Sequence, residues 1–345
     1  MDFSSRRYFL KASSLFGLGA LMIPEITGEA PQYKSSDRLI KPKKLEKGDK
    51  IAVTAPGGAI WDPQDVVRFE ELLKKMGFLV VLGETLTKKK GYLAGTDEER
   101  ASELISFFSD PTVDAIITMR GGWGCARLLD KLDYSIIQSN PKVLMGFSDI
   151  TSLLVAIYIK TGLITFHGLV GVNSWNEFST DIFKRVVCIG ENYSFPLDQS
   201  AVNTFVTIHG GKARGRLIGG NLSVLSAVIG SPYFEFPENS ILFLEETNEE
   251  PYVIDRLLTH FKLSTGYTHI NGIIFGQCSK CLAEKPDESM PTIEVIREHF
   301  SELQIPVSYG SPIGHVINKW TLPVGVEVEM DADTGALTLL EPAVK

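Results

Sequence analysis

The stretch PKVLMGFSDITSLLVAIYIKT, residues 141–161, decides the fold of the first half of the chain. The apolar run from Val143 to Phe147 predicts a buried strand, and the periodic apolar residues after it predict a helix that reaches Lys160. Ser148 lies on the turn between them, where its side chain would leave the carboxyl edge of a sheet and the backbone N–H of Asp149 can donate to an oxyanion. The turn suits a nucleophile, and the alternative is that Ser148 only caps the helix.

The turn matches the G-x-S-x-G nucleophile motif only in part. Gly146, two residues before the serine, leaves room for a sharp turn, whereas Ile150 stands where the second glycine would be. The stretch alone therefore leaves both interpretations of Ser148 open.

The residues around this stretch alternate between strand and helix patterns. Strands are predicted at residues 50–54, 78–83 and 115–119, and helices at residues 65–76 and 97–109. Such alternation predicts an α/β fold, a parallel sheet with helices on both faces. It also puts the functional loops at the carboxyl ends of the strands.

Two glycine-rich loops follow these strands, at residues 55–58 and 120–124. Glycine pairs let backbone N–H groups approach a ligand, as an oxyanion hole requires. Neither loop has the spacing of a nucleotide-binding fingerprint, which argues against nucleotide binding. Arg120 and Trp123 flank Gly121 and Gly122, so the second loop is expected to form a wall of the site.

The second half of the chain is rich in short strands and turns. Residues 172–213 are polar and lack periodicity, which predicts an irregular connecting region. Strands are then predicted at residues 240–244, 272–275, 324–329 and 337–340, and helices at residues 252–261 and 292–300. This pattern predicts a second, smaller domain with a mixed or barrel-like sheet.

A serine nucleophile needs a base and an acid that orients the base. Of the six histidines, His315 in a glycine-bounded loop and His167 after a short strand are the candidates for the base. Glu245 and Glu246 both end the apolar strand at residues 241–244. Because consecutive strand side chains point to opposite faces, only one of the two can serve, and the pattern does not choose between them.

The first residues, 1–30, are typical of an export signal. Arg6 and Arg7 precede a short apolar stretch, which matches a twin-arginine signal and is too weakly apolar for a confident membrane span. We therefore expect a periplasmic or otherwise exported protein, with the twin-arginine translocase as a partner. Cleavage near Gly28-Glu29-Ala30 and retention as an anchor both stay open, because Pro31 follows directly.

Charge and cysteine usage narrow the classes of partner. The formal net charge of −8 argues against nucleic acid, because phosphate binding needs a basic face. Cys278 and Cys281 are not accompanied by a second pair at zinc spacing, so we expect no metal ion. Only two residues separate these cysteines, which makes disulfide geometry demanding, and we expect thiols that are mostly reduced.

Five motifs taken together resemble the serine LD-carboxypeptidases, a family that also includes the microcin C self-immunity peptidases. The resemblance runs in family order from Leu45 to about Leu340. It rests on residues 120–124, 146–151, 219–222, 244–246 and 314–315, the last followed by Leu-Pro-Val-Gly at residues 322–325. It implies a first domain similar to class I glutamine amidotransferases at residues 45–171, and a C-terminal domain at residues 214–345 that supplies a glutamate and a histidine.

The resemblance also implies a catalytic triad. Ser148 would be the nucleophile, His315 the general base and Glu245 the acid that orients the base. The oxyanion would be held by the backbone N–H groups of Asp149 and of the Gly121–Gly122 loop. This implication favours a nucleophile over a helix cap at Ser148.

The implied reaction is the hydrolysis of an L,D-peptide bond without metal or cofactor, which releases terminal D-alanine from a peptidoglycan tetrapeptide. Arg120, Trp123 and Asn221 are the expected substrate-binding residues, and Trp123 stands where the family often has tyrosine. The Arg214–Arg216 pair is a second candidate for holding the terminal carboxylate. The alternatives are a same-family peptidase that detoxifies a peptidyl-nucleotide antibiotic and a non-catalytic binder of wall peptides. A homodimer is also left open.

Replacing both Arg6 and Arg7 with lysine should leave the protein in the cytoplasm, because the export machinery recognises the arginine pair. Cell fractionation measures the location, and an activity assay on lysates shows that the retained protein is folded. Unchanged delivery to the periplasm would contradict the twin-arginine interpretation.

Overall fold

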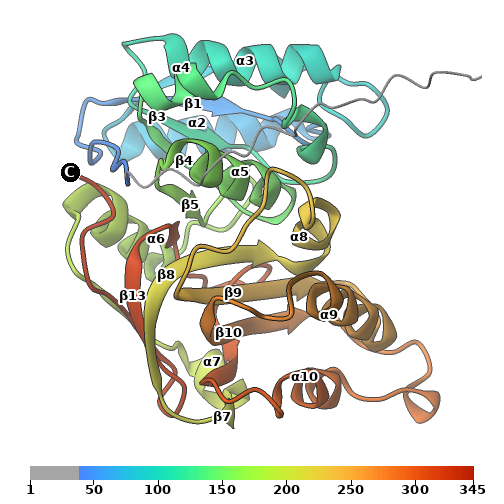
Figure 1. Ribbon diagram of the computed structural model, residues 1–345. Helices are drawn as coiled ribbons and strands as arrows, with labels where there is room; N and C mark the ends of the chain where they lie inside the picture. The colour runs from blue at the N-terminus through green and yellow to red at the C-terminus, as the bar shows by residue number, and fades with distance from the viewer. Residues whose placement is uncertain (1–38) are drawn as a thin grey trace, which may run out of the picture. The chain divides into compact units, whose positions relative to one another are not determined.

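The computed structural model describes residues 39–345, and the predicted export signal at residues 1–30 lies outside the described residues. The described part lies within one compact unit and contains two β-sheets (Figure 1). Within residues 39–345, no helix is long and apolar enough to cross a membrane. The described chain is a two-domain α/β protein, as the sequence predicts.

The first sheet is mostly parallel. Within the described residues it has six strands in the order β12-β5-β4-β3-β1-β2. Its parallel strands are β1 (Lys50–Thr54), β2 (Leu79–Leu82), β3 (Ala115–Thr118), β4 (Val143–Gly146) and β5 (Thr165–His167). All residues of β3 and β4 are buried, which explains their continuous apolar sequence.

Helices cover both faces of the first sheet. They are α2 (Pro63–Lys75), α3 (Asp97–Ser109), α4 (Tyr134–Ser139), α5 (Thr151–Thr161) and α6 (Glu177–Phe183). The strand order reverses after β2, so right-handed crossovers put α2 on one face and α3 to α5 on the other. The ring of Trp175 contacts both Phe69 of α2 and Phe183 of α6, which joins these two helices.

The helix that follows the Ser148 turn, α5, is buried on nearly all sides. Ten of its 11 residues are buried. It contacts β5 of the first sheet and both β8 (Lys212–Asn221) and α8 (Leu222–Val228) of the second half, and it lies between the two sheets in Figure 1. A helix that is apolar all round needs such a position.

The second sheet is mixed, and within the described residues it has eight strands in the order β6-β14-β13-β8-β9-β10-β11-β7. Its parallel strands are β8, β9 (Ser240–Thr247), β10 (Ile270–Ser279) and β11 (Val307–Ser311). Its antiparallel strands are β6 (Ser194–Phe195), β7 (Val206–His209), β13 (Glu327–Asp331) and β14 (Ala336–Leu339). Helices α9 (Pro251–Thr265) and α10 (Thr292–Phe300) pack against each other, and α9 also contacts α8. The second sheet is mixed, as the sequence predicts, and the smaller size of the second domain stays a prediction.

Two parts of the second half differ from the prediction. Residues 172–213 are not irregular, because they contain α6, a π-helical segment at Lys184–Ile189, β6, α7 (Gln199–Thr204) and β7. The strand predicted at residues 324–329 is two strands in different sheets, because the chain turns at Gly325, whose φ is 99°. The first of them, β12 (Leu322–Val324), pairs antiparallel with β5, so the C-terminal segment completes the N-terminal sheet.

A buried arginine connects the two glycine-rich loops. Arg100 on α3 is 0% exposed, and its guanidinium donates to the carbonyls of Pro56 and Gly124 and to the carboxylate of Asp97. Asp97 also pairs with Arg127 at 2.7 Å, and the side chain of Arg127 is about half exposed. Without the buried guanidinium, the two loop carbonyls would lose their donor.

Arg100→Met should lower the free energy of unfolding by about 3 kcal/mol, because two loop carbonyls and one carboxylate lose a buried donor. Urea denaturation measures this change. Arg127→Met is the matched control and should cost under about 1 kcal/mol, because an exposed ion pair contributes little. Equal losses in the two variants would show that Arg100 does not anchor the loops.

Candidate active site

Ser148 lies two residues beyond β4, on the turn that the sequence predicts. Its φ of 63° is a left-handed conformation that is uncommon for serine. Gly146 is required beside it, because a Cβ there would collide with the hydroxyl of Thr118 and the side chain of Ile150. Neither the 3₁₀ turn Ser148–Ile150 nor α5 has a side-chain cap, so the interpretation of Ser148 as a helix cap is wrong.

Three side chains form a hydrogen-bonded chain that spans the two sheets. The Oγ of Ser148 lies 3.2 Å from Nε2 of His315, and Nδ1 of His315 lies 2.8 Å from Oε2 of Glu245. Ser148 follows β4 of the first sheet, Glu245 belongs to β9 of the second, and His315 lies in the loop between β11 and β12. The order hydroxyl, imidazole, carboxylate is the one that an activated serine requires.

The two adjacent glutamates of β9 face different partners. Glu245 is 0% exposed and bonds His315, whereas Glu246 accepts from Asn221 at 3.0 Å and from the Ser223 hydroxyl at 2.7 Å. Burial raises the pKa of Glu245, but the hydrogen bond and charge of His315 outweigh burial and hold that pKa below its ordinary value. Burial raises the pKa of Glu246. The carboxylate next to the histidine is therefore the one whose charged form is favoured.

The second glycine loop packs directly against the Ser148 turn. A Cβ on Gly121 would lie 2.8 Å from the Cβ of Ser148 and 3.1 Å from the backbone nitrogen of Asp149. The Gly121 carbonyl accepts from the N–H of Gly58 at 2.9 Å, which joins the two glycine loops. Within residues 39–345, the N–H groups of Gly121 and Gly122 have no hydrogen-bond partner, so they are available to a ligand.

The side chain of Asp149 holds the loop and does not face the histidine. Its buried carboxylate accepts from the backbone N–H of Cys125 at 2.9 Å. Burial raises the pKa of Asp149, with the donors of Cys125 and the charge of Arg100 opposing that change. Asp149 thus fixes the far end of the glycine loop to the turn that carries Ser148.

Two of the predicted substrate-binding residues lie in the second glycine loop. Arg120 lies beside Gly58 and donates to the carbonyl of Ala59 at 3.3 Å, and its buried Nε has no partner among the described residues. Trp123 is 62% exposed, and its ring packs edge-on against Tyr92, which is also exposed. This loop therefore presents one cation and one aromatic surface beside the free N–H groups.

The other predicted substrate contacts lie at opposite ends of β8. Asn221, at the carboxyl end, is 4% exposed and caps α8 with its side chain, so a direct contact with substrate stays a prediction. Arg214 and Arg216 lie five to seven residues earlier, roughly 16–23 Å along the strand. Arg214 pairs there with Glu329 at 2.6 Å. The arginine pair is too distant from the Ser148 turn to hold a carboxylate in this site, and that candidate was wrong.

Two further side chains lie beside the hydrogen-bonded chain. His167, at the end of β5, is 1% exposed, and its Nε2 lies 4.0 Å from Oε1 of Glu245. Lys319 is 4% exposed, and its ammonium lies 4.7 Å from the ring centre of Phe147. Burial lowers the pKa of Lys319 to about 8, against the charge of Glu245. The sequence analysis missed Lys319, whose only signal was its place in the loop between His315 and β12.

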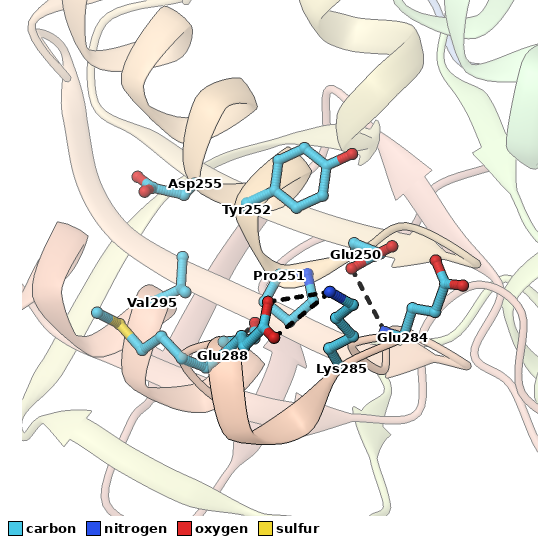
Figure 2. Close-up of a pocket in the computed structure, with 10 residues that line it drawn as sticks. Glu250, Pro251, Tyr252, Asp255, Glu284, Lys285, Glu288 and Val295 are labelled. Carbon is cyan, nitrogen blue, oxygen red and sulfur yellow. Dashed lines mark hydrogen bonds and ion pairs between the residues drawn. The ribbon is translucent and has the colours of Figure 1, made fainter.

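A separate pocket lies at the start of α9, beyond the carboxyl end of β9 (Figure 2). Its lining includes Lys285 and four carboxylates, those of Glu250, Asp255, Glu284 and Glu288. The ammonium of Lys285 pairs with Glu288 at 3.2 Å. None of the predicted site residues lines this pocket, and its surplus negative charge does not suit a substrate carboxylate.

The remaining candidate ligands do not form a metal site. Within residues 39–345, no group of three or more His, Cys, Asp or Glu residues could hold a metal ion. Cys278 and Cys281 are free thiols in the structure.

Comparison with known proteins finds one family in both halves of the chain. The model for the LD-carboxypeptidase N-terminal domain matches residues 51–168, and the model for the LD-carboxypeptidase C-terminal domain matches residues 214–330. The "probable murein peptide carboxypeptidase" of Bacillus subtilis is 34% identical over 296 residues, which cover 84% of this chain and 91% of that protein. The microcin C7 self-immunity protein MccF of Escherichia coli is 31% identical over 299 residues, which cover 79% of this chain and 86% of that protein.

Solved structures show the same similarity. The wild-type structure of MccF without ligand matches with a TM-score of 0.82 at 29% identity, over 89% of this chain and 100% of that one. The muramoyltetrapeptide carboxypeptidase from Oxalobacter formigenes matches with a TM-score of 0.73 at 27% identity, over 84% of this chain and 97% of that one. The similarity therefore covers both sheets and the region where they meet.

Proposed function

The chain belongs to the LD-carboxypeptidase family, a family of serine-type carboxypeptidases, and from this we propose that it hydrolyses the L,D-peptide bond to the terminal D-alanine of peptidoglycan tetrapeptides. The observation that carries the proposal is the unbroken hydrogen-bond chain from the Ser148 hydroxyl through His315 to the buried Glu245. Relatives named as carboxypeptidases of murein peptides and of muramoyltetrapeptides support the substrate class.

In the proposed mechanism, Ser148 attacks the carbonyl carbon of the scissile bond while Nε2 of His315 takes the hydroxyl proton. Glu245 accepts from Nδ1–H and stabilises the imidazolium that forms. The backbone N–H groups of Asp149 and of the Gly121–Gly122 loop donate to the tetrahedral oxyanion. His315 then protonates the amine of the departing D-alanine, and water releases the acyl group from Ser148 with the same histidine as base.

A carboxypeptidase must also bind the free carboxylate of its substrate. We assign this role to Arg120, because a guanidinium can bind a carboxylate bidentately and Arg120 belongs to the glycine loop that packs against the Ser148 turn. Arg120 directly precedes Gly121, so an anion held there lies close to the scissile bond. Trp123 offers an exposed aromatic surface in the same loop.

We further infer that the enzyme meets its substrate outside the cytoplasm, because Arg6 and Arg7 predict export. The similarity of the first domain to class I glutamine amidotransferases, the domain bounds and the homodimer stay predictions.

A second candidate function is the cleavage of a peptidyl nucleotide. Solved structures of MccF, with TM-scores of 0.81 and 0.82 to this chain, contain adenosine monophosphate and aspartyl sulfamoyl adenosine. Assaying an aminoacyl sulfamoyl adenosine beside a muropeptide separates the two candidates by their kcat/KM values.

Purified protein incubated with disaccharide-L-Ala-D-Glu-diaminopimelate-D-Ala should release D-alanine, and chelators should not change the rate. Ser148→Ala and His315→Ala should each reduce kcat by about 10⁴-fold or more, and the double variant should be little worse than either, because the members of a triad act as one unit. Glu245→Gln should keep more residual rate, since Glu245 orients the histidine without taking the proton. Quantifying D-alanine against time measures all four rates.

The adjacent glutamate gives this experiment its internal control. Glu246 bonds Asn221 and Ser223 instead of His315, so Glu246→Gln should reduce stability while leaving kcat per folded molecule within a few-fold of wild type. A larger loss of kcat in Glu246→Gln than in Glu245→Gln would refute the assignment of the acid. Full activity in Ser148→Ala would refute the nucleophile.

Gly121→Ala should lower kcat by about 10²- to 10³-fold, the effect of losing an oxyanion donor, because the new methyl group would push the loop away from Ser148 and the Asp149 nitrogen. Steady-state kinetics at saturating substrate measures the change, and circular dichroism checks that the fold is kept. Gly91→Ala is the control: a Cβ at Gly91 meets no atom within 4 Å, and the strain of alanine at its φ of 61° should lower stability without lowering kcat per folded molecule. A Gly121→Ala variant with wild-type kcat would exclude this loop from the oxyanion hole.

A further inference from the structure

Two buried polar atoms face each other behind the hydrogen-bonded chain, and neither has a partner. Nε2 of His167 and Oε1 of Glu245 are both enclosed without a hydrogen bond within the described residues. They lie 4.0 Å apart, and the side chains that carry them are 1% and 0% exposed. Buried polar atoms nearly always find a partner, so two that face each other at this distance need an explanation.

The ring of His167 is held in its orientation by aromatic neighbours. It makes edge contacts with Phe147 and Phe243, at 6.0 and 5.2 Å between ring centres. Phe147 also contacts the ring of His315, at 4.8 Å. Two aromatic rings thus form an apolar cage beside His167, and its Nε2 lies 4.0 Å from Oε1 of Glu245.

The charges around the pair keep His167 neutral and Glu245 ionised. Burial lowers the pKa of His167 to about 4, with Glu245 opposing this and the charges of His315 and Lys319 adding to it. Glu245 also lies beside Glu246 on its own strand, and the side-chain amide of Asn221 acts with His315 to lower the pKa of Glu245. At neutral pH a neutral imidazole thus faces a carboxylate, and Nε2 can donate to it in the tautomer that carries the ring proton on Nε2.

Strand β10, which pairs with β9, places a cysteine beside the glutamates of β9. Cys278 of β10 lies opposite Glu246 in the sheet, and the hydrogen bond with Cys281, together with burial, raises the pKa of its thiol well above the ordinary value. Cys278 therefore supplies no charge that could replace a donor to Glu245.

We propose that His167 is a positioning residue that donates from Nε2–H to Oε1 of Glu245 and so holds Oε2 on His315. An approach of about 1 Å brings the two atoms to hydrogen-bond distance. The acid would then be fixed at both oxygens, by His315 on one side and by His167 on the other. The inference rests on the proposed function, because it assigns to Glu245 the role of the acid.

The experiment compares two substitutions of His167. His167→Leu removes the donor and keeps an apolar side chain in the cage, so kcat should fall by about 5- to 100-fold with little change in KM. The acid limb of the kcat/KM profile should move to higher pH, because Glu245 without its second donor protonates more readily. His167→Gln can place an amide N–H where Nε2 lies, and it should recover most of the rate and return the limb toward its wild-type pH.

A second readout needs no substrate. The pKa of Glu245 lies below its ordinary value, so its contribution to stability is present above the unfolded pKa and is lost as pH falls through the folded pKa. In His167→Leu the free energy of unfolding should begin to fall at a higher pH than in wild type. The corresponding pH for His167→Gln should lie between those of the other two proteins. Urea unfolding measured across acidic pH tests this even if the protein releases no D-alanine.

His209→Leu is the matched control, because Nδ1 of His209 is also a buried atom without a partner among the described residues, on the edge strand β7. The acid limb of the kcat/KM profile of His209→Leu should stay at the wild-type pH. An unshifted limb together with an unshifted acid transition in His167→Leu would overturn the inference. Equal behaviour of His167→Leu and His167→Gln in both readouts would overturn it as well, since packing alone would then explain the loss.

Discussion

The buried carboxylate of Glu245 is the constraint on which the rest of the site depends. A carboxylate that is 0% exposed can stay ionised only if hydrogen bonds replace its water. His315 supplies one such bond through Nδ1, and this contact turns its other nitrogen toward the hydroxyl of Ser148. The buried charge of Glu245 thus orients His315, and that orientation places Nε2 of the histidine beside the hydroxyl of Ser148.

The site exists only where the two sheets meet. The loop that carries His315 begins after β11 of the second sheet and ends in β12, which pairs with β5 of the first sheet. Both ends of the loop are therefore fixed, each by a different sheet. The buried helix α5 fills the space between the sheets and begins at the turn that places Ser148. The same contact that buries α5 thus brings the serine to the glutamate and the histidine.

Local patterns predicted the parts of the fold that local chemistry decides. The strand that ends at Gly146, the turn at Ser148 and the apolar helix after it all lie where residues 141–161 indicate them, and α3 has the predicted bounds. Contacts between distant segments were not predictable in this way. The break at Gly325 sends two short strands to different sheets, and a single sequence gives no signal for their partners. For the same reason the sequence could not show that Arg100 joins two loops, or that Lys319 is buried beside Phe147.

The most direct test of the account is whether the carbonyl of the substrate becomes bonded to Ser148 during turnover. Protein mixed with the muropeptide is quenched in acid within milliseconds to seconds, digested and examined by mass spectrometry. The account predicts that the peptide containing Ser148 gains the mass of the muropeptide without its terminal D-alanine, and that Ser148→Ala gains none. Turnover at the full rate with that mass on another residue, or on no residue at any quench time, would contradict it.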